Sequence, residues 1–160
     1  MYSIDFIDEG LYIGNKLSAG KFELLKRTGI THILIVGNNL EPEFPICFHY
    51  KRINVWDDEK ENLRKHFPEC NSWIENAIQN NGKVLVHCSQ GISRSCAVVT
   101  AYLMYKKKFT AINALQYVKD RHRDSNPNIG FIKQLQVYEK NIGPNSNLMA
   151  NKIGCSCVTF

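Results

Sequence analysis

A reactive thiol and a guanidinium lie six residues apart in this sequence, at Cys88 and Arg94. The apolar run 84–86 predicts a strand that ends at the cysteine, and the run 95–105 predicts a helix that begins after the arginine. A loop between a strand and a helix start points several backbone N–H groups at one place, where the helix dipole adds positive potential. That place suits a tetrahedral oxyanion and a thiolate, while a guanidinium can hold two phosphate oxygens. We therefore expect covalent phosphoryl transfer with Cys88 as the nucleophile.

The residues around this pair form a recognisable pattern, His87-Cys88-Ser89-Gln90-Gly91-Ile92-Ser93-Arg94-Ser95. The pattern resembles the signature H-C-x5-R-S/T of the cysteine-dependent protein phosphatases, and its ending resembles their dual-specificity branch. In the competing interpretation Cys88 is a small buried hydrophobe and Arg94 a surface charge, but the signature in its strand–loop–helix context favours chemistry. The resemblance implies a phosphate-binding loop that comprises Ser89, Gln90, Gly91, Ile92, Ser93 and Arg94.

The similarity extends over about residues 3–140. Further family-like stretches are 11–14, 31–34, 101–104, 126–131, 134–135 and 138–139. The chain is shorter than tyrosine-specific phosphatase domains and shows no kinase-docking domain, so it resembles the small atypical dual-specificity phosphatases. The resemblance implies metal-independent hydrolysis of phosphotyrosine and phosphoserine/threonine on proteins through a cysteinyl-phosphate. The expected partners are phosphorylated proteins.

This reaction needs a general acid, because the departing oxygen must be protonated. Members of the family carry an aspartate for this purpose on the loop that follows the strand before the active-site strand. Here Asp57 and Asp58 compete for the role, and aligning 53–55 with the family strand favours Asp57. In the alternative interpretation, either residue is an ordinary solvated loop acid.

Four other residues near the signature have candidate supporting roles. Ser95 resembles the family hydroxyl that hydrogen-bonds the sulfur and assists its departure. His87 precedes the cysteine on a strand and so points the other way, which favours a bond to nearby backbone over a role as general base. Asn128 matches a family asparagine that braces the phosphate loop, although asparagines are also common at helix starts. Cys96 could trap an oxidised Cys88 as a disulfide, but a buried residue of the central helix is the favoured interpretation.

Two other functions compete with the protein phosphatase hypothesis. One is a phosphatase of a non-protein phosphate, such as a lipid, an RNA 5′ end or a glucan. The uncharged residues Ser89, Gln90, Ile92 and Ser93 argue against a phosphoinositide, because such relatives tend to carry lysines there. The other is a phospho-binding adaptor without turnover, which the presence of a cysteine, an arginine and an acid disfavours.

The composition is that of an ordinary globular domain, with 160 residues, 44% hydrophobic and 22% charged. A net charge of +5 suits an anionic substrate, but the basic residues are too scattered to predict a nucleic-acid partner. No secretory signal is visible, so we expect a cytoplasmic protein whose six cysteines are free. No grouped histidines and cysteines have metal spacing, and we expect a monomer without metal or cofactor.

The predicted elements alternate between strands and helices. Strands are expected on both sides of the turn at 8–10, over 31–36, over 47–55 and over 84–86. Helices are expected from an N-cap at Ser18 to 28, from Pro68 to 79, over 95–105, over 111–118, and from a cap and start at Asn126-Pro127. This order predicts an α/β fold with a mostly parallel central sheet flanked by helices on both sides, as in the protein tyrosine phosphatases.

We expect a catalytic domain over residues 1–142 and a flexible tail over 143–160, which is rich in turn-forming residues. Within the tail, Cys157 is fourth from the end, the C-a-a-X spacing for prenylation. Cys155 offers a second acylation site, which a stable membrane anchor would need. The alternative is that both cysteines are accidental, because Thr159 is a poor match to the usual aliphatic residue.

Overall fold

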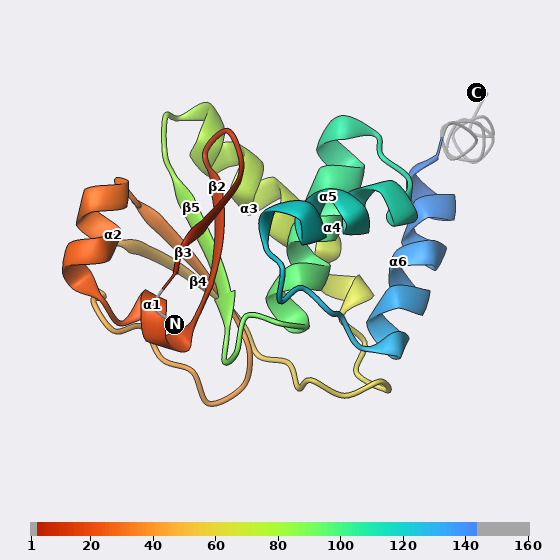
Figure 1. The fold of residues 1–160 in the computed structure, drawn as a ribbon, viewed down its shortest axis with the longest axis horizontal. Coiled ribbons are helices and arrows are strands. Elements are labelled where there is room, and N and C mark those ends of the chain that lie inside the picture. Colours follow the sequence, from red (N-terminus) through yellow and green to blue (C-terminus); the bar gives the residue numbers. More distant parts are fainter. Residues whose placement is uncertain (1–2, 144–160) are drawn as a thin grey trace, which may run out of the picture.

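The computed structural model describes residues 3–143, so Cys155 and Cys157 lie outside the described residues. Its centre is a five-stranded sheet (Figure 1). The strands are β1 (Asp5–Asp8), β2 (Leu11–Asn15), β3 (His32–Val36), β4 (His49–Ile53) and β5 (Val84–Cys88). They lie in the order β1-β2-β5-β3-β4, and all neighbours are parallel except the hairpin of β1 and β2. The predicted mostly parallel sheet is confirmed.

Helices cover both faces of the sheet, as expected (Figure 1). One face carries α1 (Lys16–Ala19) and α2 (Phe22–Thr28). The other carries α3 (Phe67–Gln79), α4 (Arg94–Lys107), α5 (Ala111–Arg121) and α6 (Ile129–Ile142), and a 3₁₀ turn, η1 (Arg64–His66), precedes α3. Within residues 3–143, no helix is long and apolar enough to cross a membrane.

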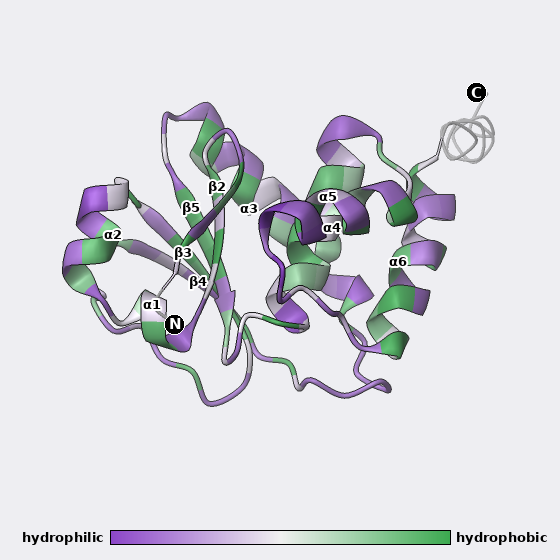
Figure 2. Ribbon diagram, viewed as in Figure 1, coloured by the Kyte–Doolittle hydropathy of each residue, from purple (hydrophilic) through white to green (hydrophobic). Residues whose placement is uncertain are grey.

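The two elements that carry the ends of the signature, β5 and α4, are deeply buried. Every residue of β5 is buried, because β2 and β3 lie on either side and helices cover both faces. The residues of α4 from Arg94 to Met104 are likewise buried. Figure 2 shows hydrophobic residues along β5 and on the inner sides of the helices around it. The loop 89–93 is therefore held between two rigid elements at the carboxyl edge of the parallel strands, where α/β proteins place their sites.

Two helix starts differ from the sequence-based expectation. Asn15, not Ser18, caps α1, and Ser18 is the third helical residue of a capping box with Asn15. That helix ends at Gly20, so the expected single helix is two short ones. The last helix begins after Asn128, whose side chain accepts from the Phe131 N–H, rather than at Asn126.

The expected strand over 47–55 is shorter, because only His49–Ile53 pairs with β3. The residues that follow leave the sheet and lead into the loop that carries Asp57 and Asp58. The predicted helix end at residue 28 is confirmed, and the next residue, Gly29, has a left-handed φ of 84° that favours glycine.

Candidate active site

Cys88 is the last residue of β5, and its thiol is enclosed by possible hydrogen-bond donors. The side chain is 2% exposed. Its Sγ accepts from the Gly91 N–H at 3.2 Å and lies 3.2 Å from the Ser95 Oγ. Both groups can donate to the sulfur when it is negatively charged, and a charged acceptor makes the stronger hydrogen bond. The expected proximity of Ser95 to the sulfur is present in the structure.

Arg94 is the first residue of α4 and is only 8% exposed. Hydrogen bonds hold both terminal nitrogens of its guanidinium. One terminal nitrogen, Nη1, donates to the Asn38 Oδ1 at 3.1 Å and to the Val55 carbonyl at 3.2 Å. The other, Nη2, donates to the Ser89 Oγ at 3.3 Å. The Nε is buried and has no hydrogen-bond partner among the described residues. A buried unpaired donor is costly, so this N–H is suited to an anion in the loop.

Gly91 occupies a loop position that no other residue fits. Its φ is +72°, and an added Cβ would lie 2.8 Å from the Gly14 carbonyl oxygen.

Two carbonyl groups of the phosphate loop accept hydrogen bonds from backbone N–H groups outside the loop. Ser89 O accepts from Lys16 N–H at 3.1 Å, and Ile92 O accepts from Asn126 N–H at 2.8 Å. In a planar trans peptide the N–H points opposite to the carbonyl, so outward carbonyls turn N–H groups toward the centre of the loop.

Asp57 is tied to the phosphate loop, whereas Asp58 is not. The Asn128 side-chain nitrogen donates to the Asp57 Oδ1 at 2.9 Å. The backbone N–H of Asn128 donates to the Ser93 Oγ at 2.9 Å. One residue therefore joins the loop that carries Asp57 (the acid loop) to the phosphate-binding loop 89–94 (the cradle). Asp58 instead accepts from the Lys60 N–H at 2.7 Å and closes its own turn. The geometry favours the first of the two candidate acids.

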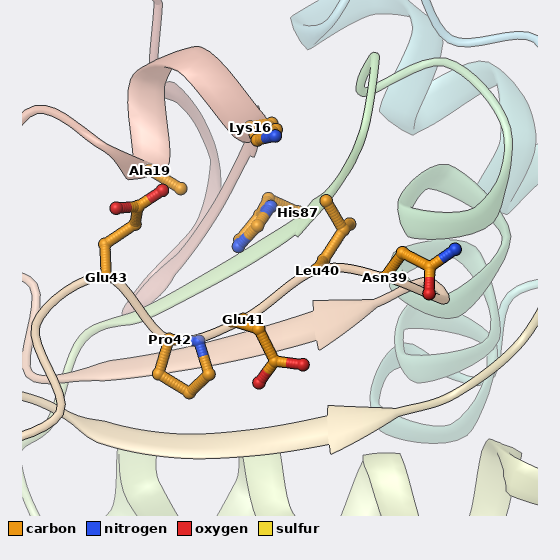
Figure 3. Close-up of a pocket in the computed structure, with 8 residues that line it drawn as sticks. All are labelled: Lys16, Ala19, Asn39, Leu40, Glu41, Pro42, Glu43 and His87. Atoms are coloured by element: carbon orange, nitrogen blue, oxygen red, sulfur yellow. The ribbon is translucent and has the colours of Figure 1, made fainter.

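His87 points away from the sulfur, as the strand alternation predicts. Its Nδ1 lies 3.3 Å from the Cys88 carbonyl oxygen. The ring borders a pocket of about 240 Å³ between α1 and the loop after β3 (Figure 3). Burial lowers the pKa of this imidazole to about 4, so it is neutral at physiological pH.

Cys96 is fully buried on α4, as the favoured interpretation has it. Its Sγ donates to the Gly91 carbonyl at 3.5 Å. Burial raises the pKa of this thiol to about 12, which keeps it protonated and unreactive. Among residues 3–143 no group of three or more histidine, cysteine or carboxylate side chains could hold a metal ion.

Several residues of the site carried no local signal in the sequence. Asn38 follows β3 and Val55 follows β4, so both reach Arg94 only because parallel strands end at one edge. The Asp57–Asn128 contact joins residues 71 positions apart.

Comparisons with known proteins give one consistent family. A family model described as the dual specificity phosphatase catalytic domain matches residues 11–141. Dual specificity protein phosphatase 1 of Arabidopsis thaliana is 45% identical over 136 residues, covering 85% of this chain and 69% of the relative. Dual specificity protein phosphatase 1B of the same plant is 44% identical, covering 88% and 84%. The crystal structure of a mouse putative dual specificity phosphatase complexed with zinc tungstate is 35% identical with a TM-score of 0.84, covering 96% and 92%.

Proposed function

The chain belongs to the dual specificity phosphatase family, and on this premise we propose that Cys88, Arg94, Asp57 and Ser95 carry out its reaction. The enzyme is a protein phosphatase that acts on phosphotyrosine and on phosphoserine and phosphothreonine. The observation that carries the residue assignment is the pairing of an enclosed sulfur with an unpaired buried guanidinium N–H. Together they offer a nucleophile and an anion site at the end of β5.

In the first step the Cys88 thiolate attacks phosphorus. An S–P bond forms while the ester P–O bond breaks, and the departing oxygen takes a proton from the Asp57 carboxyl. Nitrogens of the Arg94 guanidinium and the inward N–H groups of the loop stabilise charge on the equatorial oxygens. The contact with Asn128 supports this role for Asp57, because it holds the carboxyl next to the loop.

In the second step water attacks the cysteinyl-phosphate. Asp57, now ionised, takes a proton from the water as the O–P bond forms and the S–P bond breaks. The sulfur leaves as a thiolate, and the nearby Ser95 hydroxyl can donate to it. Inorganic phosphate is released and the starting protonation state is restored.

A pair of neighbouring variants tests the acid. We expect Asp57→Asn to lower kcat by roughly 10²–10⁴ for a phosphoserine peptide and far less for an aryl phosphate whose leaving group is a weak base. The matched control, Asp58→Asn, removes the same charge one residue away and should remain within a few-fold of wild type. The reverse pattern would assign the role to Asp58.

We propose that residues 1–142 form the catalytic domain of a cytoplasmic monomer whose partners are phosphorylated proteins. The expected lipid on Cys157 lies outside the described residues, and the expected second site, Cys155, lies there as well. Mass spectrometry of the C-terminal peptide from cells tests the proposed lipid on Cys157. An unmodified Cys157 thiol on all copies would contradict it.

A further inference from the structure

The carbonyl of Gly91 is held differently from the neighbouring carbonyls of the phosphate loop. Ser89 O, Ile92 O and Ser93 O accept from backbone N–H groups. Gly91 O lies 2.5 Å from the Nε2 of His122, the cap residue that follows α5. A titratable side chain thus supports the very residue whose own N–H donates to the Cys88 sulfur.

His122 is itself held by a carboxylate from the far end of the chain. The ring is 6% exposed, and its Nδ1 lies 2.6 Å from the Asp5 Oδ2 on β1. Because a carbonyl can only accept, Nε2 must carry a proton in this contact. A neutral ring would then turn the lone pair of Nδ1 toward the carboxylate. The imidazolium is the form that donates from both nitrogens, and its charge is balanced by Asp5.

A charged donor on Gly91 O also acts on the opposite side of that peptide. The peptide group joins the Gly91 carbonyl to the Ile92 N–H, and in a planar trans peptide the two point in opposite directions. Pulling electron density toward the carbonyl strengthens the N–H as a donor, because linked hydrogen bonds polarise one another. The outward side of this peptide faces His122, so its N–H faces the inside of the loop.

We propose that Asp5 and His122 form a charge-balanced positioning pair that holds and polarises the Gly91–Ile92 peptide for binding the transferred phosphoryl group. Neither side chain reaches the reacting atoms, so neither is a catalytic residue. The inference rests on the proposed role of the Cys88 loop and adds to it a supporting pair outside that loop. It predicts that the phosphate loop binds phosphate more weakly when either member of the pair is replaced by a neutral side chain of similar size.

Other ionisable groups near this pair lie on the elements packed around it. Cys96 of α4 donates to the same carbonyl oxygen, and the Cys88 thiol lies on the other side of Gly91. On α5 itself, the Arg121 guanidinium lies 3.4 Å from the centre of the Tyr117 ring. Cys96 stays protonated at accessible pH, because burial raises its pKa to about 12.

The test separates charge from shape. Asp5→Asn removes the carboxylate while keeping its size, and His122→Gln keeps an N–H donor for Gly91 O without the charge. Asp8→Asn is the matched control, because Asp8 lies on the same strand and also pairs with a cation and a tyrosine, Lys107 and Tyr117. Vanadate and inorganic phosphate are the probes, since both report on the cradle without a leaving group.

We expect Asp5→Asn and His122→Gln to weaken inhibition by vanadate about 5- to 30-fold and to lower kcat similarly, as for one charge-assisted hydrogen bond made neutral. Asp5→Glu keeps the carboxylate and should recover most of the vanadate inhibition that Asp5→Asn loses, because the proposal requires the charge at this position. Asp8→Asn should match wild type in both assays.

Two outcomes would overturn the proposal. One is vanadate inhibition that is unchanged in Asp5→Asn and His122→Gln. The other is an equal loss in Asp8→Asn, which would indicate a general effect of charge on β1. Urea denaturation of each variant shows whether the fold is intact, and the solvent contact of Asp5 makes Asp5→Asn the safer variant for folding. Failure of the proposed catalytic role is distinguishable, because it would appear as turnover by Cys88→Ser.

Discussion

Replacing Gly130 by alanine should disable the acid loop while sparing the phosphate cradle. Gly130 is the second residue of α6 and packs directly on the backbone of the loop that carries Asp57. An added Cβ would lie 2.1 Å from the Glu59 carbonyl oxygen and 2.6 Å from its Cα. Ordinary contacts begin near 3.4 Å, so the loop must retreat by about 1.3 Å.

This retreat draws Asp57 away from its partner at the start of the same helix. Asn128 is two residues before Gly130, and its bond to Asp57 is 2.9 Å long. A displacement of about 1 Å in a catalytic group can lower a rate by roughly 10²-fold. The loss of stability should be small, because overpacking costs about 1–3 kcal/mol and alanine regains about 1 kcal/mol in a helix. The exposed residues 57–60 can also move without opening the core.

The assay compares kcat for a phosphoserine peptide with kcat for an aryl phosphate, alongside inhibition by inorganic phosphate. Gly130→Ala should lower the first about 10²-fold, the second much less, and leave phosphate inhibition within two-fold of wild type. Gly20→Ala is the control, because the nearest atom to its added Cβ is 3.6 Å away. Wild-type kcat on the peptide in folded Gly130→Ala would refute the reasoning.

Three other substitutions and one additive test the account. Burial lowers the pKa of His87 to about 4 from 6.5, so the unfolded chain binds a proton first as pH falls. Urea titrations should therefore show wild type losing about 2 kcal/mol more than His87→Asn between pH 7.5 and 5. Tyr138→Phe should cost about 1–3 kcal/mol by leaving Asn71 without its buried 2.8 Å partner, whereas an unchanged urea midpoint would contradict that bond. Asn128→Ala should lower peptide kcat at least ten-fold, and wild-type kcat would show that Asp57 needs no such support. Turnover should persist in EDTA; a chelator-sensitive rate would oppose the metal-free mechanism.

The central part of the fold could be predicted from sequence because its signal is local. The apolar run before Cys88 forms a strand that is buried on every side, and the run after Arg94 forms the central helix. The run of apolar residues was therefore enough to predict each element. The errors fell where two local signals compete. Asn15 and Ser18 are both good caps, and the reciprocal capping box that they form places the helix start at the first.

The supports of the site could not be predicted, because they depend on contacts between distant segments. His122 and Asp5 are 117 residues apart, and nothing in either neighbourhood indicates the other. Asn128 could be identified by resemblance, but its bond to Asp57 requires the acid loop to fold over the start of α6. The sequence therefore predicts which groups react, whereas their positioning emerges only from tertiary packing.

The central claim is that phosphate is transferred to Cys88, and trapping the intermediate tests it most directly. The enzyme is mixed with a radiolabelled aryl phosphate, quenched by denaturation within milliseconds, and digested for mass spectrometry. The account predicts a burst of label that approaches one phosphate per chain on the Cys88 peptide and is absent in Cys88→Ser. Steady turnover with no label on Cys88, or label on Ser95 instead, would contradict it.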